Sequence, residues 1–294
     1  MKRIRLYLPN VLLTFLLVFF LLGSELTMLA SRVALNADAF ALVEQQQDLG
    51  GKAYSTLETY FNTRSNSTGI PAEVFLAAVD EAAVSRGIHA SVEAAFAYLN
   101  GRADSFSYTM DFTALEDSVN AFFSDYAEAG GYEKDAVYEQ KVASVIAEAE
   151  GEILFVTDTF KFSVLEENGW LGRLRKAVSY LDLLQTVALG GTAVILVLLL
   201  LCNLRQFAHM AYWLGLAGLI GGLLLLVPAV YIQATDFFSG FAIKDPQIFA
   251  AVVGFLQLLT QRALVMAIAT AAAGIVLLVL FGILHGNREK QQES

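Results

Sequence analysis

The sequence predicts an all-α integral membrane protein with four transmembrane helices and a large helical extracytoplasmic domain between helices 1 and 2. Two observations lead to this fold class. Hydrophobic residues make up 56% of the 294 residues and charged residues only 16%, whereas soluble domains have roughly 25% charged residues. The apolar residues gather in four stretches of about 20 residues, which is the length that crosses a bilayer as a helix.

The four apolar stretches cover residues 11–30, 183–202, 211–232 and 263–284, and the last three contain no Asp, Glu, Lys or Arg. A backbone in lipid must satisfy its own hydrogen bonds, so each stretch is expected to be helical. The first stretch has a basic start, as a cleaved signal peptide would. Because no small-x-small cleavage site follows Leu22, we expect a retained helix.

The basic residues near the predicted spans indicate the orientation. The basic residues of the two terminal segments and of the short link between helices 2 and 3 fall on one side of a four-span protein. They are Lys2, Arg3, Arg5, Arg205, Arg288 and Lys290. The positive-inside rule then places both termini in the cytoplasm. The chain is therefore expected to be a multi-pass protein of the plasma (cell) membrane. Arg173, Arg175 and Lys176 fall on the opposite side, but long segments translocate largely regardless of their charge.

These positions divide the chain into eight parts. The predicted parts are the cytoplasmic N-terminus with transmembrane helix 1 (1–30), the acidic extracytoplasmic domain (31–180), helix 2 (181–204), a cytoplasmic link (205–210), helix 3 (211–232), an outer loop with a helical extension (233–262), helix 4 (263–285) and a cytoplasmic tail (286–294).

The net charge of −10 resides in one part of the chain. Residues 31–180 contain 23 acidic and 11 basic side chains, so this part carries −12 and the remainder +2. Such an acidic domain argues against nucleic-acid binding and attracts cationic partners. Cys202 is the single cysteine, which excludes a disulfide scaffold.

The domain at 31–180 is expected to be helical, because strong helix formers dominate it and Pro71 is its single proline. We predict helices over 71–87, 90–99, 113–130 and 133–167. Pro71 and Gly87 mark the ends of the first, and a capping box at Thr113–Glu116 begins the third. The Gly50–Gly51 pair is predicted to be a flexible point.

Two transmembrane helices are expected to continue outward for about 40 residues each, over 10–47 and 247–285, since no proline interrupts either segment. Asp245 and Pro246 read as the cap and first position of the second. Its first part, residues 247–260, is apolar and is predicted to bury against the outer domain. The alternatives are a position in the membrane interface or against a partner.

No catalytic, cofactor or metal site is expected. His89 is alone in the outer domain, and a zinc site needs further His or Cys ligands. Carboxylate pairs such as Asp80–Glu81 are interpreted as a solvated acidic face. No phosphate-binding loop, nucleophile elbow or zinc-protease motif is present.

Two charged residues fall within or beside the predicted spans. Glu25 and Arg262 each lie near the outer end of a span in this assignment, and they are a candidate pair across helices 1 and 4. The alternative is that Arg262 reaches the lipid headgroups. With no charge expected at mid-membrane, ion-coupled transport by this chain alone is disfavoured.

Small residues recur at four-residue spacing in helices 3 and 4, where they allow helices to approach closely. They are Gly218, Gly222, Ala263, Ala267 and Ala271. We predict that they pack within one molecule, and contact between copies in a homo-oligomer is the alternative.

Together these observations predict a non-enzymatic polytopic membrane protein whose extracytoplasmic helical domain binds a protein partner or an envelope ligand. One alternative is an oligomeric channel or transport-complex subunit. Another is a sensor component that acts through a partner, because the cytoplasmic segments are too short for an output domain. The expected partners are the lipid bilayer, a protein at the outer domain and a second copy of the chain, without nucleic acid.

Overall fold

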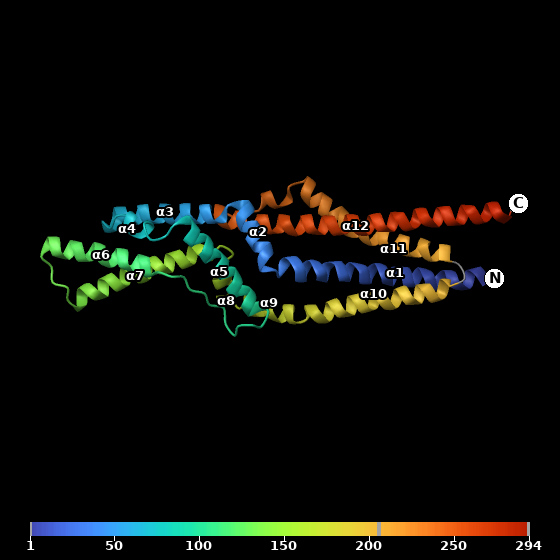
Figure 1. Ribbon diagram of the computed structural model, residues 1–294, viewed down its shortest axis with the longest axis horizontal. Helices are drawn as coiled ribbons and strands as arrows, with labels where there is room; N and C mark the ends of the chain where they lie inside the picture. The colour runs from blue at the N-terminus through green and yellow to red at the C-terminus, as the bar shows by residue number, and fades with distance from the viewer. Residues whose placement is uncertain (1, 205–206, 293–294) are drawn as a thin grey trace. The chain divides into compact units, whose positions relative to one another are not determined.

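The computed structural model describes the backbone of residues 2–204 and 207–292, and within these the side chains of residues 7–204 and 208–285. Helices are the regular secondary structure of the described chain, which has no strands (Figure 1). It divides into two compact units. The span unit comprises Met1–Asn36, Ala177–Phe241 and Leu256–Ser294, and the polar unit comprises Ala37–Lys176 and Ala242–Phe255.

Within its described residues, the span unit contains four helices that are long and apolar enough to cross a membrane, which agrees with the predicted number of spans. They are α1 (Lys2–Leu29), α10 (Leu181–Asn203), α11 (Phe207–Ala234) and α12 (Pro246–Gln292). Large apolar side chains remain exposed on all four, as a lipid-facing surface requires: Phe15, Val194, Val227 and Val265 are 58–70% exposed. The basic side chains used for the orientation, at 2, 3, 5, 205, 288 and 290, lie outside the described side chains.

The span unit has a core where α1 packs against α10 and α11. Its buried members are Leu17, Val18, Ile195, Leu199, Trp213 and Ala217. Helix α11 meets α12 through glycine: a Cβ at Gly222 would lie 2.5 Å from the backbone nitrogen of Ala271, and a Cβ at Gly274 would lie 2.4 Å from that of Leu219. Such spacing leaves no room for a side chain, so backbone contact holds this pair together.

The predicted continuous helix over 10–47 is wrong, because it breaks before the polar unit. Helix α1 ends at Leu29 and widens into a π turn, Ala30–Ala34. The amide of Leu35 then donates to the carbonyl of Ala30 at 2.9 Å, and the chain turns before α2 (Ala37–Gln47) begins. Neither proline nor glycine marks this break in the sequence.

The polar unit is built from short and medium helices: α2, α3 (Leu49–Thr68), α4 (Glu73–Leu76), α5 (Glu81–Leu99), α6 (Thr113–Gly130), α7 (Ala136–Thr157), α8 (Phe162–Glu167) and most of α9 (Trp170–Ser179). Aromatic and aliphatic side chains fill its core, among them Phe40, Leu57, Phe61, Ile88 and Ile153. Its polar surface and buried core are those of a domain that packs in water.

Several predicted boundaries within the polar unit are wrong. Gly87 does not end a helix but lies inside α5, because Asp80 accepts a hydrogen bond from the amide of Ala83 and begins a new helix after α4. A Cβ at Gly87 would lie 2.5 Å from Sδ of Met110, so the glycine permits close packing. Residues 90–99 belong to this same helix.

The other corrections have similar local causes. Gly50 and Gly51 are helical residues of α3, and the left-handed residue before them is Asp48 (φ 50°). Helix α6 has the predicted bounds, but Asp111 rather than a capping box accepts from the amide of Thr113. The predicted helix over 133–167 is divided into α7 and α8 by a turn in which Lys161 is left-handed.

The beginning of α12 confirms the predicted cap, and it confirms only in part the packing predicted for residues 247–260, because residues from Leu256 onward belong to the span unit. Asp245 accepts hydrogen bonds from the amides of Gln247 and Ile248 at 2.8 and 3.1 Å, as a helix cap does. The apolar first part of the helix, up to Phe255, is part of the polar unit. There the ring of Phe255 packs on that of Phe40 with centroids 4.4 Å apart, and Gln247 is buried.

Candidate functional site

A buried carboxyl group in the span unit is the first candidate. Glu25 on α1 is only 9% exposed, and its Oε1 accepts a hydrogen bond from the hydroxyl of Thr270 on α12. Its other oxygen, Oε2, is buried without a hydrogen-bond partner among the described residues. A polar atom in this state destabilises the fold by about 1–3 kcal/mol unless something supplies a donor.

The neighbours of Glu25 locate it near mid-height of the span unit. The adjacent Ser24 has its hydroxyl oxygen 3.5 Å from that of Thr192, the middle residue of α10 (Leu181–Asn203). Ala271, next to Thr270, meets Gly222, which is two residues from the middle of α11. The flanks of helix 1 alone do not fix its offset from the other helices, and the expectation that no charge lies at mid-membrane stays a prediction because it concerns the bilayer.

Glu25 and Arg262 are not joined in the structure. Arg262 precedes Thr270 by eight residues on α12, a distance of about 12 Å along a helix. Its side chain is exposed, and the ion pairs between described residues do not include it. The alternative that Arg262 reaches lipid headgroups stays a prediction.

Of the five small residues predicted to pack, Gly218, Gly222 and Ala271 lie at the contact of α11 and α12. Gly218 has Gly274 as its neighbour, with 3.2 Å from its ideal Cβ position to Cα of Gly274. The alanines of α12 at 263, 267 and 271 are all buried, Ala267 completely. These contacts lie within one molecule.

An open groove of about 430 Å³ lies beside the Glu25–Thr270 pair and is lined by all four helices of the span unit. Its wall includes Leu21 of α1, Thr192 of α10, Leu214 of α11, and Thr270 and Ala273 of α12. The volume is within the range of about 300–1,000 Å³ that is typical of ligand pockets. Sequence reasoning missed the groove, since it depends on how four helices diverge rather than on any motif.

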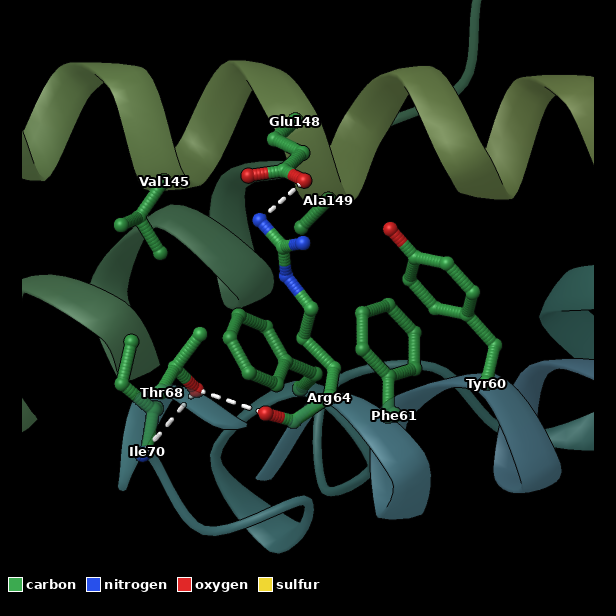
Figure 2. Close-up of a pocket in the computed structure, with 9 residues that line it drawn as sticks. Tyr60, Phe61, Arg64, Thr68, Ile70, Val145, Glu148 and Ala149 are labelled. Atoms are coloured by element: carbon green, nitrogen blue, oxygen red, sulfur yellow. Dashed lines mark hydrogen bonds and ion pairs between the residues drawn. The ribbon is translucent and has the colours of Figure 1, made fainter. Parts of the chain in front are cut away.

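The polar unit contains a small pocket between α3 and α7, shown in Figure 2. Arg64 extends from α3 to form an ion pair with Glu148 of α7, and the ring of Phe61 stacks on Phe75 with centroids 4.6 Å apart. Burial, reinforced by the nearby charges of Glu152 and Glu148, raises the pKa of Tyr60 at its rim. The pocket has a volume of about 30 Å³, which is enough for a water molecule only. We therefore interpret this pocket as structural.

A buried carboxylate at the corner between α7 and α8 is also structural. Asp158 is 1% exposed. Its Oδ1 accepts from Ser91 Oγ at 3.1 Å and from the amide of Phe162 at 2.9 Å. Its Oδ2 accepts from the amide and the hydroxyl of Ser163. All its acceptor capacity is used to join α5 to the start of α8, which leaves none for a ligand.

The second candidate is the exposed tip of the hairpin formed by α6 and α7, residues 125–138, which we call the hairpin tip (Figure 1). Of these residues only Ala127 is buried. Tyr126 and Tyr132 stack with ring centroids 5.9 Å apart and are 60% and 62% exposed. Val137, five residues after Tyr132, is 56% exposed. Tyrosine is enriched at protein interfaces, which makes this exposed pair a candidate interaction surface.

The hairpin is strongly acidic, with ten Asp and Glu and two Lys residues between Thr113 and Thr157. Lys134 donates to Glu128 at 3.0 Å and to the hydroxyl of Ser124 at 2.7 Å, which lowers the pKa of Glu128. Burial and the negative charge of Glu116 raise the pKa of Glu150. Most of the negative charge on the hairpin is therefore not compensated within it.

His89 is half exposed, with its Nδ1 3.8 Å from a carboxylate oxygen of Glu93 one turn away. Among the described residues no three His, Cys, Asp or Glu side chains are grouped as a metal site would require.

Comparisons with protein-family models, with curated proteins and with solved structures find no match for this chain.

Proposed function

We propose that this chain is a non-enzymatic membrane protein that displays its polar unit on the extracytoplasmic side of the cell membrane and binds a protein partner through the hairpin tip. The four apolar helices support the membrane location. The basic residues at 2, 3, 5, 205, 288 and 290 support the orientation, because short segments rich in Lys and Arg favour the cytoplasmic side of a membrane.

The observation that carries the docking proposal is the stacked Tyr126–Tyr132 pair, exposed on a hairpin whose carboxylates outnumber its lysines by ten to two. Aromatic side chains provide much of the energy at protein interfaces, and their ring faces attract Lys and Arg. The carboxylates add long-range attraction for the same side chains. The partner is therefore a protein with a Lys- and Arg-rich surface.

The orientation can be tested with cysteine labelling of the full chain in intact cells. After Cys202→Ala, a single cysteine is placed at the hairpin tip by Ala129→Cys or in the tail by Ser294→Cys. A membrane-impermeant maleimide is expected to label the tip, and to label the tail only after the cells are opened. Labelling of the tail but not the tip in intact cells contradicts the orientation.

The docking surface can be tested by replacing Tyr132 with a photoreactive amino acid in the full chain and crosslinking in the host membrane. Reversal of two tip charges, Asp125→Lys and Glu133→Lys, is expected to reduce the crosslinked product at least about tenfold, since each close charge pair contributes 1.5 kcal/mol or more. Glu58→Lys on α3, which is also exposed, is the matched control and leaves the product unchanged. A product that survives the tip reversal, or its absence from the parent chain, contradicts docking at this site.

A transport or channel subunit is the second candidate, and Glu25 is the observation that favours it. A carboxyl group buried near mid-height of a membrane protein is costly and commonly belongs to a path for protons or ions. Reconstituted vesicles test this: the candidate requires an ion or proton flux that Glu25→Gln reduces. A protein that is strictly monomeric in lipid and conducts nothing contradicts it.

A further inference from the structure

A polar pocket lies where α11 ends beside α12. It has a volume of about 230 Å³, somewhat below the range of about 300–1,000 Å³ that is typical of pockets for drug-sized ligands. One wall is the end of α11 with the short helix η2 (Phe237–Gly240) that follows it, and the other is the segment of α12 from Gln257 to Gln261. All these residues belong to the span unit.

The pocket lies at the depth of the lipid headgroups when the four helices span a bilayer as proposed. Gly222 of α11 adjoins Ala271 of α12, and both lie near the middle of their apolar stretches. Counted from this contact, Gln233 is 11 residues further along α11 and Gln261 is ten residues back along α12, or about 17 and 15 Å along the helices. Half of the hydrocarbon core is about 15 Å thick. Both walls therefore reach the edge of the core together.

The polar side chains of the wall are open to a ligand. Gln233, Asp236 and Gln261 are exposed, and Gln257 is half-buried. No hydrogen bond or ion pair with a described residue engages the carboxylate of Asp236 or the side-chain amides of these three glutamines. Their donors and acceptors are therefore available to a ligand in the pocket.

The charge of the wall selects the kind of ligand. Among the described residues that line the pocket, Asp236 is the charged one, so a cationic group is attracted and a purely anionic headgroup is repelled. Phe238 also lines the pocket, and aromatic rings attract cations. The glutamine amides are neutral donors that suit phosphate oxygens. Arg262 is exposed but is not part of this wall.

We propose that the pocket binds the headgroup of a zwitterionic phospholipid with a primary ammonium group, the ammonium on Asp236 and the phosphate on the glutamine amides. A primary ammonium donates hydrogen bonds to a carboxylate, whereas a trimethylammonium group has no N–H to donate. Trimethylammonium groups are typically held by a cage of several aromatic rings, and Phe238 is the aromatic residue among the described residues of this wall. The proposal rests on the membrane location proposed above, but neither on the orientation nor on the hairpin tip.

The experiment compares two photoreactive lipids on the full chain in phosphatidylcholine nanodiscs. The probes are a phosphatidylethanolamine and a phosphatidylcholine with the same diazirine-bearing acyl chain, so they differ only in the methyl groups on nitrogen. We expect the ethanolamine probe to crosslink up to about fivefold more efficiently, because an exposed ion pair contributes up to about 1 kcal/mol and 1.4 kcal/mol is tenfold.

Peptide mapping is expected to place the crosslinks in residues 231–241 and 256–262. Incorporation of the chain into the nanodisc is measured in every sample, which separates a lost preference from a chain that has left the membrane. Equal crosslinking of the two probes, or crosslinks that map elsewhere, overturns the proposed site.

Asp236→Asn tests the ammonium contact. Asp236 is left-handed, with φ 46°, and Asn adopts this conformation readily, so the fold is kept while the charge is lost. The preference for the ethanolamine probe is expected to disappear. Asp182→Asn is the matched control, because Asp182 is exposed in the first turn of α10 but does not line the pocket, and it leaves the preference unchanged. A preference that survives Asp236→Asn, or that is lost equally in both variants, overturns the ammonium contact.

Gln257→Leu tests the phosphate contact. The substitution keeps the approximate size of the side chain and removes its amide, so crosslinking of both probes is expected to fall several-fold, since both carry the same phosphate. Gln185→Leu on α10 is the control: Gln185 is also half-buried but lies outside the pocket wall. Unchanged crosslinking in Gln257→Leu, or an equal fall in the control, overturns the placement of the phosphate.

Glycerophosphoethanolamine, which carries the same headgroup without acyl chains, separates a lipid from a soluble ligand. Added at the concentration of the lipid probe, it is expected to leave crosslinking unchanged, because it does not concentrate in the bilayer. Loss of crosslinking in its presence assigns the pocket to a soluble compound and overturns the lipid as its ligand.

Discussion

The corner between α7 and α8 offers a sharp test of how the polar unit is held together. Asp158→Asn changes one carboxylate oxygen into an NH₂ group with almost no change in size. The two oxygens accept from the amides of Phe162 and Ser163 respectively, at 2.9 and 2.8 Å. Either orientation of the new amide therefore places a donor against a backbone donor at the start of α8.

The expected cost is about 2–4 kcal/mol. One hydrogen bond to a charged group is lost, which contributes about 1.5–3 kcal/mol, and one buried backbone amide is left without an acceptor. Because Asp158 is 1% exposed, water cannot replace the lost partner without local opening. We expect α8 to open about 30- to 700-fold more often, at 1.4 kcal/mol for each factor of ten.

Hydrogen exchange of the full chain in detergent, followed by mass spectrometry on peptides from 158–168, measures this opening. Asp135→Asn is the control: Asp135 is exposed and caps α7 by accepting from the amide of Tyr138 at 2.9 Å, and Asn caps equally well. Exchange that rises less than about tenfold in Asp158→Asn, or rises equally in the control, would refute the reasoning.

Three further predictions concern packing and pH. Gly222→Ala forces α11 and α12 apart and is expected to lower the free energy of unfolding in detergent by about 1–3 kcal/mol, measured by thermal unfolding. Gly221→Ala is the control and is expected to leave it unchanged, because the space around the Cβ position of Gly221 is open. Equal effects of the two substitutions argue against the glycine contact. In the polar unit, Gly87→Ala is expected to destabilise the fold by about 1–3 kcal/mol, as measured by denaturant unfolding. In the same measurement, Gly151→Ala is expected to stabilise the fold by up to about 1 kcal/mol, because it removes an exposed helical glycine. Burial raises the pKa of Tyr108 to about 12, which means that the folded state favours the neutral phenol. The contribution of Tyr108 to the free energy of unfolding is therefore full below about pH 10 and is lost as the pH rises to about 12. Tyr108→Phe is expected to remove this decline, and an unchanged pH profile contradicts it.

The number of spans could be predicted from the sequence because each apolar stretch matches the bilayer on its own. The cap at Asp245 could also be predicted, since it depends on residues that are adjacent in the chain. Local signals of this kind need no knowledge of tertiary contacts. They failed where a tertiary contact decides, as at Gly87, whose missing side chain accommodates Met110 rather than ending a helix.

The groove and the depth of Glu25 could not be predicted for a related reason. The flanks of α1 place Glu25 toward one end of its own helix, but its height in the unit depends on which residues of α10 and α12 it meets. That offset depends on close contacts such as that of Gly23 on α1 with Ala188 on α10. A single sequence does not state which small residues face one another.

The first turns of α12 also constrain how the chain is made. Residues 37–176 of the polar unit leave the ribosome about 70 residues before the segment that completes their core, with two membrane spans synthesised in between. Until Gln247 and Phe255 arrive, Phe40 lacks one of its aromatic neighbours and the carbonyl of Val156 lacks its donor. The polar unit therefore finishes folding only after α10 and α11 have been made, and a fragment that stops at residue 176 is an incomplete domain.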